Sequence, residues 1–221
     1  MNKLIYISFC ILLSIGVYAQ TADEIVQKHF EVTGGQDNWK ALSSIQIKGE
    51  VAVGVGEVVP IVIEHKRPYF KRVSYVIYDK EILNEGFDGK QAYTYDESDG
   101  GFKMLPGYTP DAFETDLLNY DRKGFKLSLI GKEKVNGTDA YKVKLIKNTI
   151  EDFYWFDAET YNLIKEENQI ETIYYSNFRR FGKLIFATRM ENLPVGGKEY
   201  VVLFTDVQPN ASIPDKRFKF N

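Results

Sequence analysis

The sequence has very few of the residues that most often bind metals or act as nucleophiles. Its 221 residues include only 1 Cys and 2 His. Zinc and iron–sulfur sites need several such ligands, and Cys–His catalysis needs both residue types close together. The sequence therefore predicts neither a metal site nor a cofactor.

An excess of charge of one sign is also missing. Lys and Arg total 28 and Asp and Glu total 31, which gives a formal net charge of −3. Because no basic excess is present to neutralise a phosphate backbone, we expect no nucleic-acid partner. Hydrophobic residues make up 44% of the chain and aromatic residues 14%. This composition is typical of a folded chain rich in β structure.

The first segment has the pattern of an export signal. After a positively charged start, residues 4–17 are apolar, but they are too few to span a membrane comfortably. Small residues at Val17 and Ala19 predict a signal peptide at residues 1–19, cleaved after Ala19. An uncleaved membrane anchor is the alternative interpretation. Cleavage would remove Cys10, and we therefore expect a thiol-free protein exported to a bacterial periplasm.

Helical signals occur near the start of the mature chain and once in its middle. Thr21 and Glu24 form a capping-box pattern, and the helix they open is expected to end at residues 34–35, which are both Gly. Residues 36–42 indicate a short second helical turn. Residues 110–118 predict a third helix, with Thr109 before it and Pro at its first position.

Most of the remaining sequence is typical of antiparallel strands. Apolar residues alternate at 125–129 and 141–145, and Asn136-Gly137 between them is a strong hairpin signal. We expect about eleven strands joined by short loops, in one domain over residues 20–221. Residues 58–63, 184–187 and 200–204 are apolar on both faces. Either a curved sheet covered by helices or an apolar ligand, or a two-sheet sandwich, would bury both faces.

Known catalytic motifs do not occur. The sequence contains no G-x-S-x-G, H-E-x-x-H, P-loop or G-x-G-x-x-G pattern. The adjacent acids Glu151 and Asp152 could serve a hydrolase, but charges at strand ends are usually just solvated. We therefore expect a binding protein rather than an enzyme.

Several short motifs follow one another along the mature chain. Residues 66–70 read K-R-P-Y-F, and residues 87–95 read F-D-G-K-Q-A-Y-T-Y. Their order resembles the LolA-like outer-membrane lipoprotein-sorting proteins, which have a K-R-P-x-x-F strand start and a D-G-K-x-x-W-x-Y strand, where this chain has Tyr93 in place of Trp. Residues 154–160 and 206–220 resemble two later segments of that family. The resemblance extends over most of the mature chain.

The resemblance implies a mainly β (α+β) fold, an unclosed antiparallel barrel with lid helices over an apolar face. It implies a monomeric periplasmic carrier of lipoprotein acyl chains or another lipid, with an inner-membrane donor and an outer-membrane acceptor. It also implies that Arg67 acts in lid closure and cargo transfer. The expected cavity liners are apolar residues of strands and lid: Ile25, Phe30, Phe70, Tyr93, Phe113, Leu117, Tyr154, Phe156, Tyr174 and Phe186.

Two other functions remain open from the sequence. The same fold could serve a regulatory module of the cell envelope that senses lipid or peptide. The chain could also be a purely structural envelope protein.

Overall fold

The structure is a computed structural model that describes residues 20–54, 56–96, 98, 100–108 and 114–220. The predicted signal peptide lies outside this range. Two short helices precede the strands: α1 (Ala22–Val32) and α2 (Gln36–Lys40). A 3₁₀ helix, η1 (Asp215–Phe218), lies near the C-terminus. Among the described residues, no helix is long and apolar enough to cross a membrane.

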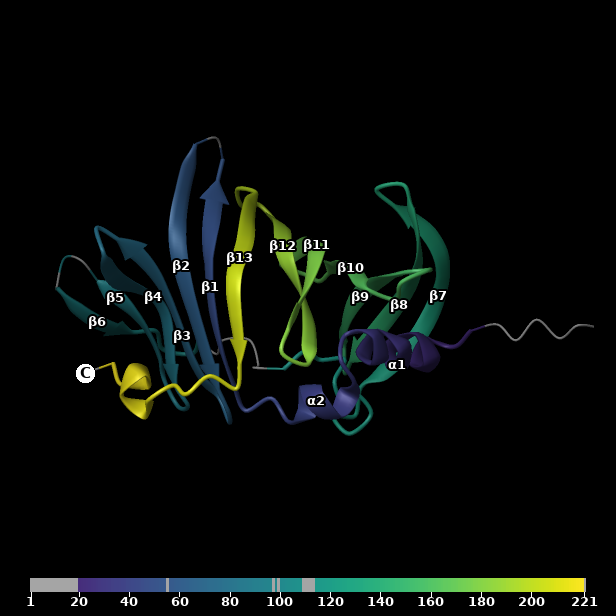
Figure 1. The fold of residues 1–221 in the computed structure, drawn as a ribbon, viewed down its shortest axis with the longest axis horizontal. Helices are drawn as coiled ribbons and strands as arrows, with labels where there is room; N and C mark the ends of the chain where they lie inside the picture. Colours follow the sequence, from purple (N-terminus) through teal and green to yellow (C-terminus); the bar gives the residue numbers. More distant parts are fainter. Residues whose placement is uncertain (1–19, 55, 97, 99, 109–113, 221) are drawn as a thin grey trace, which may run out of the picture.

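All strands belong to one sheet in which each described pair of neighbours is antiparallel (Figure 1). The first group is β1 (Ser44–Val53), β2 (Glu57–Lys66), β3 (Phe70–Ile77), β4 (Lys80–Asp88), β5 (Ala92–Asp96) and β6 (Gly101–Met104). The second group is β7 (Lys126–Val135), β8 (Thr138–Lys147), β9 (Ile150–Asp157), β10 (Leu163–Glu167), β11 (Glu171–Phe181), β12 (Leu184–Pro194) and β13 (Tyr200–Pro209).

The sheet is open, with β6 at one edge and β7 at the other. The strand order is β6-β5-β4-β3-β2-β1-β13-β12-β11-β10-β9-β8-β7. The predicted unclosed antiparallel fold is therefore confirmed, and the sheet has 13 strands rather than about eleven. Strands such as β5, β6 and β10, with 5, 4 and 5 residues, are too short to show a clear alternation. No two-sheet sandwich is present in the described part of the chain.

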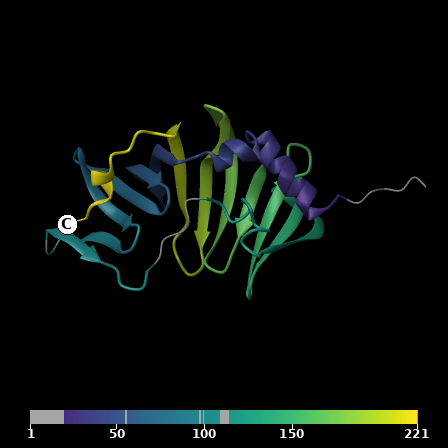
Figure 2. The same ribbon diagram turned by 90° about the horizontal axis from the view of Figure 1, so that it is seen from below.

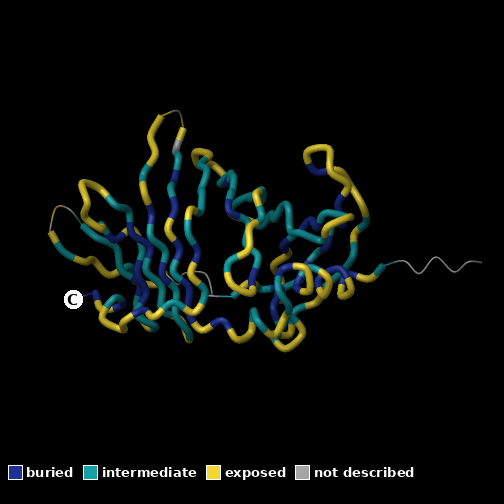
Figure 3. Tube along the Cα trace, in the orientation of Figure 1, coloured by how far each residue is buried: buried dark blue, intermediate teal, exposed yellow. Residues whose placement is uncertain are grey.

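Helix α1 forms as the sequence predicts. The Thr21 side chain accepts a hydrogen bond from the Glu24 N–H, and the Glu24 carboxylate accepts one from the Thr21 N–H. Its apolar side packs on β8 and β9, where Ile25, Phe30 and Phe156 are fully or almost fully buried. We call this side of the sheet the inner face and the opposite side the outer face. Figure 3 shows the buried stretches along α1 and the strands.

A long segment joins the two edges of the sheet. Residues 105–108 and 114–125, here the crossing segment, lie in the chain between β6 and β7, which are at opposite edges of the sheet (Figure 2). Leu117 and Leu118 of this segment are buried in the core cluster beneath α1. The expected helix over 110–118 is not found where it can be checked, because residues 114–118 form a bend and turns. Residues 109–113, including Phe113, lie outside the described range.

The C-terminal segment covers the outer face of the other half of the sheet. Phe218 stacks on Phe70 and Phe220 packs on Tyr93, with ring centroids 5.3 and 5.2 Å apart. The Phe220 ring occupies the space above Gly86, where an added Cβ would come within 2.4 Å of it. Both faces of the sheet are therefore covered, by the helices at one end and by this segment at the other.

Candidate functional site

A cavity of about 650 Å³ lies against the inner face of the central strands. Strand register places its lining residues on one side of the sheet: Ile61 pairs with Tyr75, Val51 with Val202, and Met190 with Tyr175. The lining is mostly apolar and comes from β1–β4 and β11–β13: Val51, Ile61, Ile63, Val73, Tyr75, Ile173, Tyr175, Met190, Tyr200, Val202 and Phe204. His65, Asn84 and Asn192 are its other members.

Two smaller cavities continue this site toward the helices. One of about 240 Å³ shares Tyr175, Met190 and Phe204 with the main cavity. A second, of about 170 Å³, shares His29 and Trp39 with the first and reaches the crossing segment. We call the three cavities together the trough. It runs from the central strands to the space below α1 and α2.

The two histidines of the chain both line the trough. Burial lowers the pKa of His29 to about 4, although a hydrogen bond to the Tyr161 carbonyl oxygen at 3.0 Å acts in the opposite direction. Burial and the nearby Lys71 lower the pKa of His65 to about 3. Both imidazoles are therefore neutral near pH 7, and neither adds charge to the apolar walls.

Arg67 connects the end of the helical region to the crossing segment. Its Nε donates a 2.7 Å hydrogen bond to the Leu42 carbonyl, and its Nη2 lies 2.8 Å from the Glu114 carboxylate. The planar guanidinium allows both contacts at once. The structure thus places Arg67 between the two elements that border the trough, and its role in lid closure and cargo transfer remains a prediction.

A second group of ion pairs holds the crossing segment two residues after Glu114. Lys147 of β8 lies 2.7 Å from Asp116 of the crossing segment and 2.5 Å from Asp152 of β9. Burial alone would lower the pKa of Lys147, but hydrogen bonds to both carboxylates raise it above its ordinary value. Residues 114–116 of the crossing segment are therefore held by ion pairs to both Arg67 and Lys147.

The acids Glu151 and Asp152 do not form a catalytic pair. They are adjacent on β9, so their side chains point to opposite faces. Glu151 pairs with Lys144 at 2.9 Å, whereas Asp152 is buried and pairs with Lys147. Within the described residues, no group of three or more His, Cys, Asp or Glu side chains could hold a metal ion.

The structure places the predicted cavity liners in three different surroundings. Phe30, Leu117 and Phe186 line the smaller cavities of the trough. Three others, Ile25, Tyr154 and Phe156, are packed in the core cluster beneath α1. Burial also raises the pKa of Tyr154, with nearby carboxylates adding to the effect.

The remaining described liners lie on the outer face. Phe70 and Tyr93 contact the C-terminal segment, as described above. Tyr174 packs in the cluster around Trp155, where the Lys165 ammonium lies 4.0 Å from the Trp155 ring centroid. Its neighbour Tyr175 lines the trough instead, because successive residues of a strand face opposite sides.

Sequence reasoning missed several trough residues, including Trp39, Tyr175, Met190, Val202 and Phe204. The apolar run at residues 200–204 indicated a strand buried on both faces. It did not indicate which of its residues face the trough.

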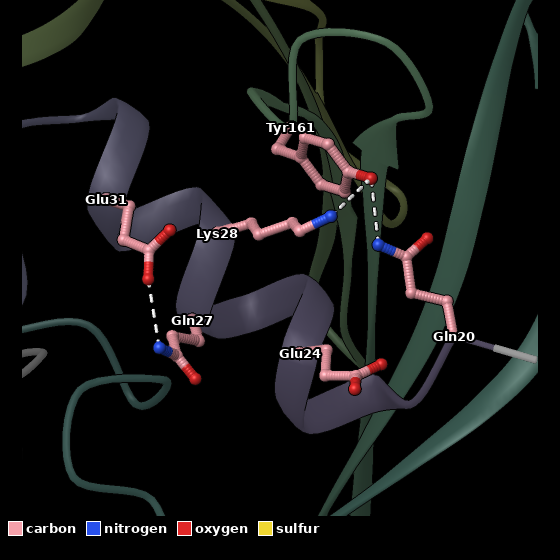
Figure 4. A pocket seen from close by; sticks show the side chains of 6 residues that line it. All are labelled: Gln20, Glu24, Gln27, Lys28, Glu31 and Tyr161. Atoms are coloured by element: carbon pink, nitrogen blue, oxygen red, sulfur yellow. Dashed lines mark hydrogen bonds between the residues drawn. The ribbon is translucent and has the colours of Figure 1, made fainter. Parts of the chain in front are cut away.

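Two further cavities lie outside the trough. One of about 540 Å³ is lined by Gln20, Tyr161 and polar residues of α1 (Figure 4). Gln20 and Lys28 each donate a hydrogen bond to the Tyr161 hydroxyl, at 2.8 and 3.2 Å, which lowers the pKa of Tyr161. The other, of about 630 Å³, lies beside the C-terminal segment. The first suits hydrated polar groups rather than an apolar ligand.

Solved structures with the same architecture are known. A LolA superfamily protein from Nitrosomonas europaea matches with a TM-score of 0.58 and 16% identity, over 91% of this chain and 98% of that one. A putative outer membrane lipoprotein-sorting protein domain from Vibrio parahaemolyticus matches with a TM-score of 0.57 and 12% identity, over 90% and 96% of the chains. A DUF1329 family protein from Desulfovibrio piger matches with a TM-score of 0.59 and 12% identity, over 88% and 97%.

These matches define the class of fold. The chain has a LolA-like fold, as its sequence motifs indicated. No protein-family model matches the sequence, and no curated protein matches it.

Proposed function

We propose that this protein carries a lipid, or the acyl chains of a lipoprotein, in the trough. The observation that carries the proposal is the main cavity of about 650 Å³ with its mostly apolar lining. The LolA-like fold supports it, because one matching structure is described as a putative outer membrane lipoprotein-sorting domain.

The physical basis is the transfer of acyl chains from membrane to protein. Each CH₂ group removed from water contributes about 0.8 kcal/mol, so ten buried groups contribute about 8 kcal/mol. Part of this is offset by the entropy lost when the chain is held in one place. A trough with these walls can therefore replace the membrane as the apolar surroundings of the cargo.

The cellular setting belongs to the same proposal. We place residues 20–221 in the periplasm as one domain, after removal of residues 1–19. The cargo would be taken from a donor at the inner membrane and delivered to an acceptor at the outer membrane. Opening of the crossing segment, with Arg67 at its border, would allow entry and release.

Adjacent valines on β13 provide a matched test. Val202 lines the trough, whereas Val201 pairs with Ala52 and Glu191 on the opposite face. A carboxylate introduced by Val202→Asp would have to be desolvated against an acyl chain. We expect Val202→Asp to weaken lipid binding at least about tenfold, and Val201→Asp to leave it unchanged.

The measurement is native mass spectrometry of the 20–221 protein purified from a periplasm without detergent, followed by titration with lipid. Bound lipid in the wild type and in Val201→Asp, but not in Val202→Asp, would support the proposal. Absence of bound lipid and of lipid uptake in the wild type would contradict it. Binding without transfer to acceptor vesicles would favour a lipid-sensing module with the same fold.

A further inference from the structure

The carboxyl group of Glu166 lies beside the apolar walls of the trough. Glu166 of β10 pairs in register with Tyr154 on one side and Ile173 on the other. Ile173 lines the main cavity, so Glu166 is on the inner face. Its Oε2 accepts a 3.0 Å hydrogen bond from the Tyr175 hydroxyl. Tyr175 in turn lines both the main cavity and the cavity next to it.

Glu166 has no cationic partner among the described residues. No Lys, Arg or His nitrogen of that part of the chain lies within 4.0 Å of its carboxylate. Its neighbour Glu167 differs, since it pairs with Lys165 at 2.8 Å. The charge of Lys147 acts to lower the pKa of Glu166, but the Lys147 ammonium is already engaged by Asp116 and Asp152.

The other groups around Glu166 do not supply positive charge. Tyr154 and Asp152 face it from β9, and Glu171 and Tyr175 lie on β11. A carboxylate that is taken from water needs a proton, a counter-ion or several hydrogen bonds. Here the protein provides one hydrogen bond, from Tyr175.

We propose that Glu166 and Tyr175 form a polar anchor for the head group of the cargo, and that this head group carries an ammonium. The inference rests on the proposed lipid-binding function and specifies its ligand class. An ammonium beside Tyr175 can donate to the tyrosine oxygen and to the Glu166 carboxylate, while the acyl chain follows the trough. Charge-assisted hydrogen bonds of this kind are stronger than neutral ones.

The titration of Glu166 gives the proposal a distinctive pH dependence. Burial raises the pKa of Glu166 to about 7, the hydrogen bond from Tyr175 acts in the opposite direction, and Asp152 raises it further. Above that pKa the carboxylate is charged and attracts an ammonium. Below it the carboxyl is neutral and the attraction is lost. The preference for an ammonium ligand should therefore increase as pH rises through this value.

The test compares ligands that have the same chain and different heads. Calorimetric titrations with dodecylamine, dodecanol and ethylamine are carried out about one pH unit below and above the pKa of Glu166. For the wild type above that pKa, we expect dodecylamine to bind about tenfold or more tightly than dodecanol. Ethylamine should not compete with dodecylamine for binding, because it carries the ammonium but lacks the long alkyl chain that the trough holds.

Two variants distinguish a specific contact with Glu166 from the effect of removing a negative charge anywhere on the strand. Glu166→Gln keeps the size of the side chain and should abolish both the preference for dodecylamine and its pH dependence. Glu167→Gln removes the same charge one residue away and should leave both unchanged. Equal binding of dodecylamine and dodecanol by the wild type would contradict the proposed role of Glu166 but not the proposed lipid-carrier function. Failure of both long-chain ligands to bind would overturn the carrier itself.

Discussion

At the scale of single residues, two lysines of β8 form ion pairs that differ sharply in burial. Lys144 contacts Glu151, whose side chain is 48% exposed, and Lys147 contacts Asp152, whose side chain is 4% exposed. Exposed pairs contribute little to stability, whereas removal of one partner of a buried pair leaves an uncompensated charge.

Lys147→Met should therefore lower the free energy of unfolding by about 3 kcal/mol. The matched control Lys144→Met should lower it by less than about 1 kcal/mol. Urea denaturation of both variants measures the difference. Equal losses would show that Asp152 does not depend on Lys147 for its charge balance.

His29 makes stability depend on pH in a defined direction. Its pKa falls from 6.5 in the unfolded chain to about 4 in the fold, because burial disfavours the charged imidazolium. The unfolded state therefore binds the proton more tightly, and stability is lost as pH falls from about 6.5 to about 4.

The variant His29→Gln removes this contribution. We expect the stability of the variant relative to the wild type to rise by about 1–3 kcal/mol as pH falls through that window. Denaturant titrations at several pH values give this difference directly. A constant difference across the window would mean that folding does not lower the pKa of His29.

At the scale of elements, the proposed carrier function needs the crossing segment to open and admit cargo. Arg67 pairs with Glu114 and Lys147 pairs with Asp116 of this segment. The next two residues, Leu117 and Leu118, are buried. Residues 114–118 of this segment are therefore held by side-chain ion pairs and buried leucines.

Arg67→Leu removes one of these contacts without touching the core beneath α1. We expect the variant to keep the fold, to exchange amide hydrogens of residues 114–125 at least about tenfold faster, and to transfer lipid at a changed rate. Hydrogen exchange and a vesicle-transfer assay provide the two readouts. Unchanged exchange and unchanged transfer would remove Arg67 from the mechanism.

The elements that the sequence predicted well are those with local signals. Helix α1 follows from its capping box, and the β7–β8 hairpin follows from Asn136-Gly137, where both residues adopt positive φ. The alternation of Tyr141, Val143 and Leu145 placed three buried residues correctly on one face. Each of these signals acts within a few residues of the chain.

The site residues were harder to predict because their placement depends on distant contacts. Ile173, Tyr174 and Tyr175 are consecutive and apolar, so no alternation showed which of them faces inward. Phe70 and Tyr93 are covered by a segment that is far away in the sequence. Glu166 belongs to a charged run, K-E-E, that is typical of a solvated strand end.

At the scale of the whole molecule, the open sheet creates the trough. The two faces of the sheet are covered by different segments, and the C-terminal segment covers one part of the outer face. On the inner face, α1, α2 and the crossing segment cover one end of the sheet and leave a cavity of about 650 Å³ against the central strands. In the proposed function, an acyl chain occupies this space.

The two tryptophans of the chain allow a direct measurement of this claim. Trp39 lines the smaller cavities of the trough, and Trp155 is buried in the cluster on the outer face. Bromine quenches tryptophan fluorescence only near contact, so a brominated fatty acid reports which tryptophan it approaches. The variant Trp155→Phe isolates the signal of Trp39, and Trp39→Phe isolates that of Trp155.

We predict that the brominated fatty acid quenches Trp39 in a saturable manner and does not quench Trp155. The affinity obtained from this quenching should equal the affinity of the unbrominated fatty acid measured by competition. Binding of the ligand without quenching of Trp39, or equal quenching of both tryptophans, would place the acyl chain outside the trough and contradict the account.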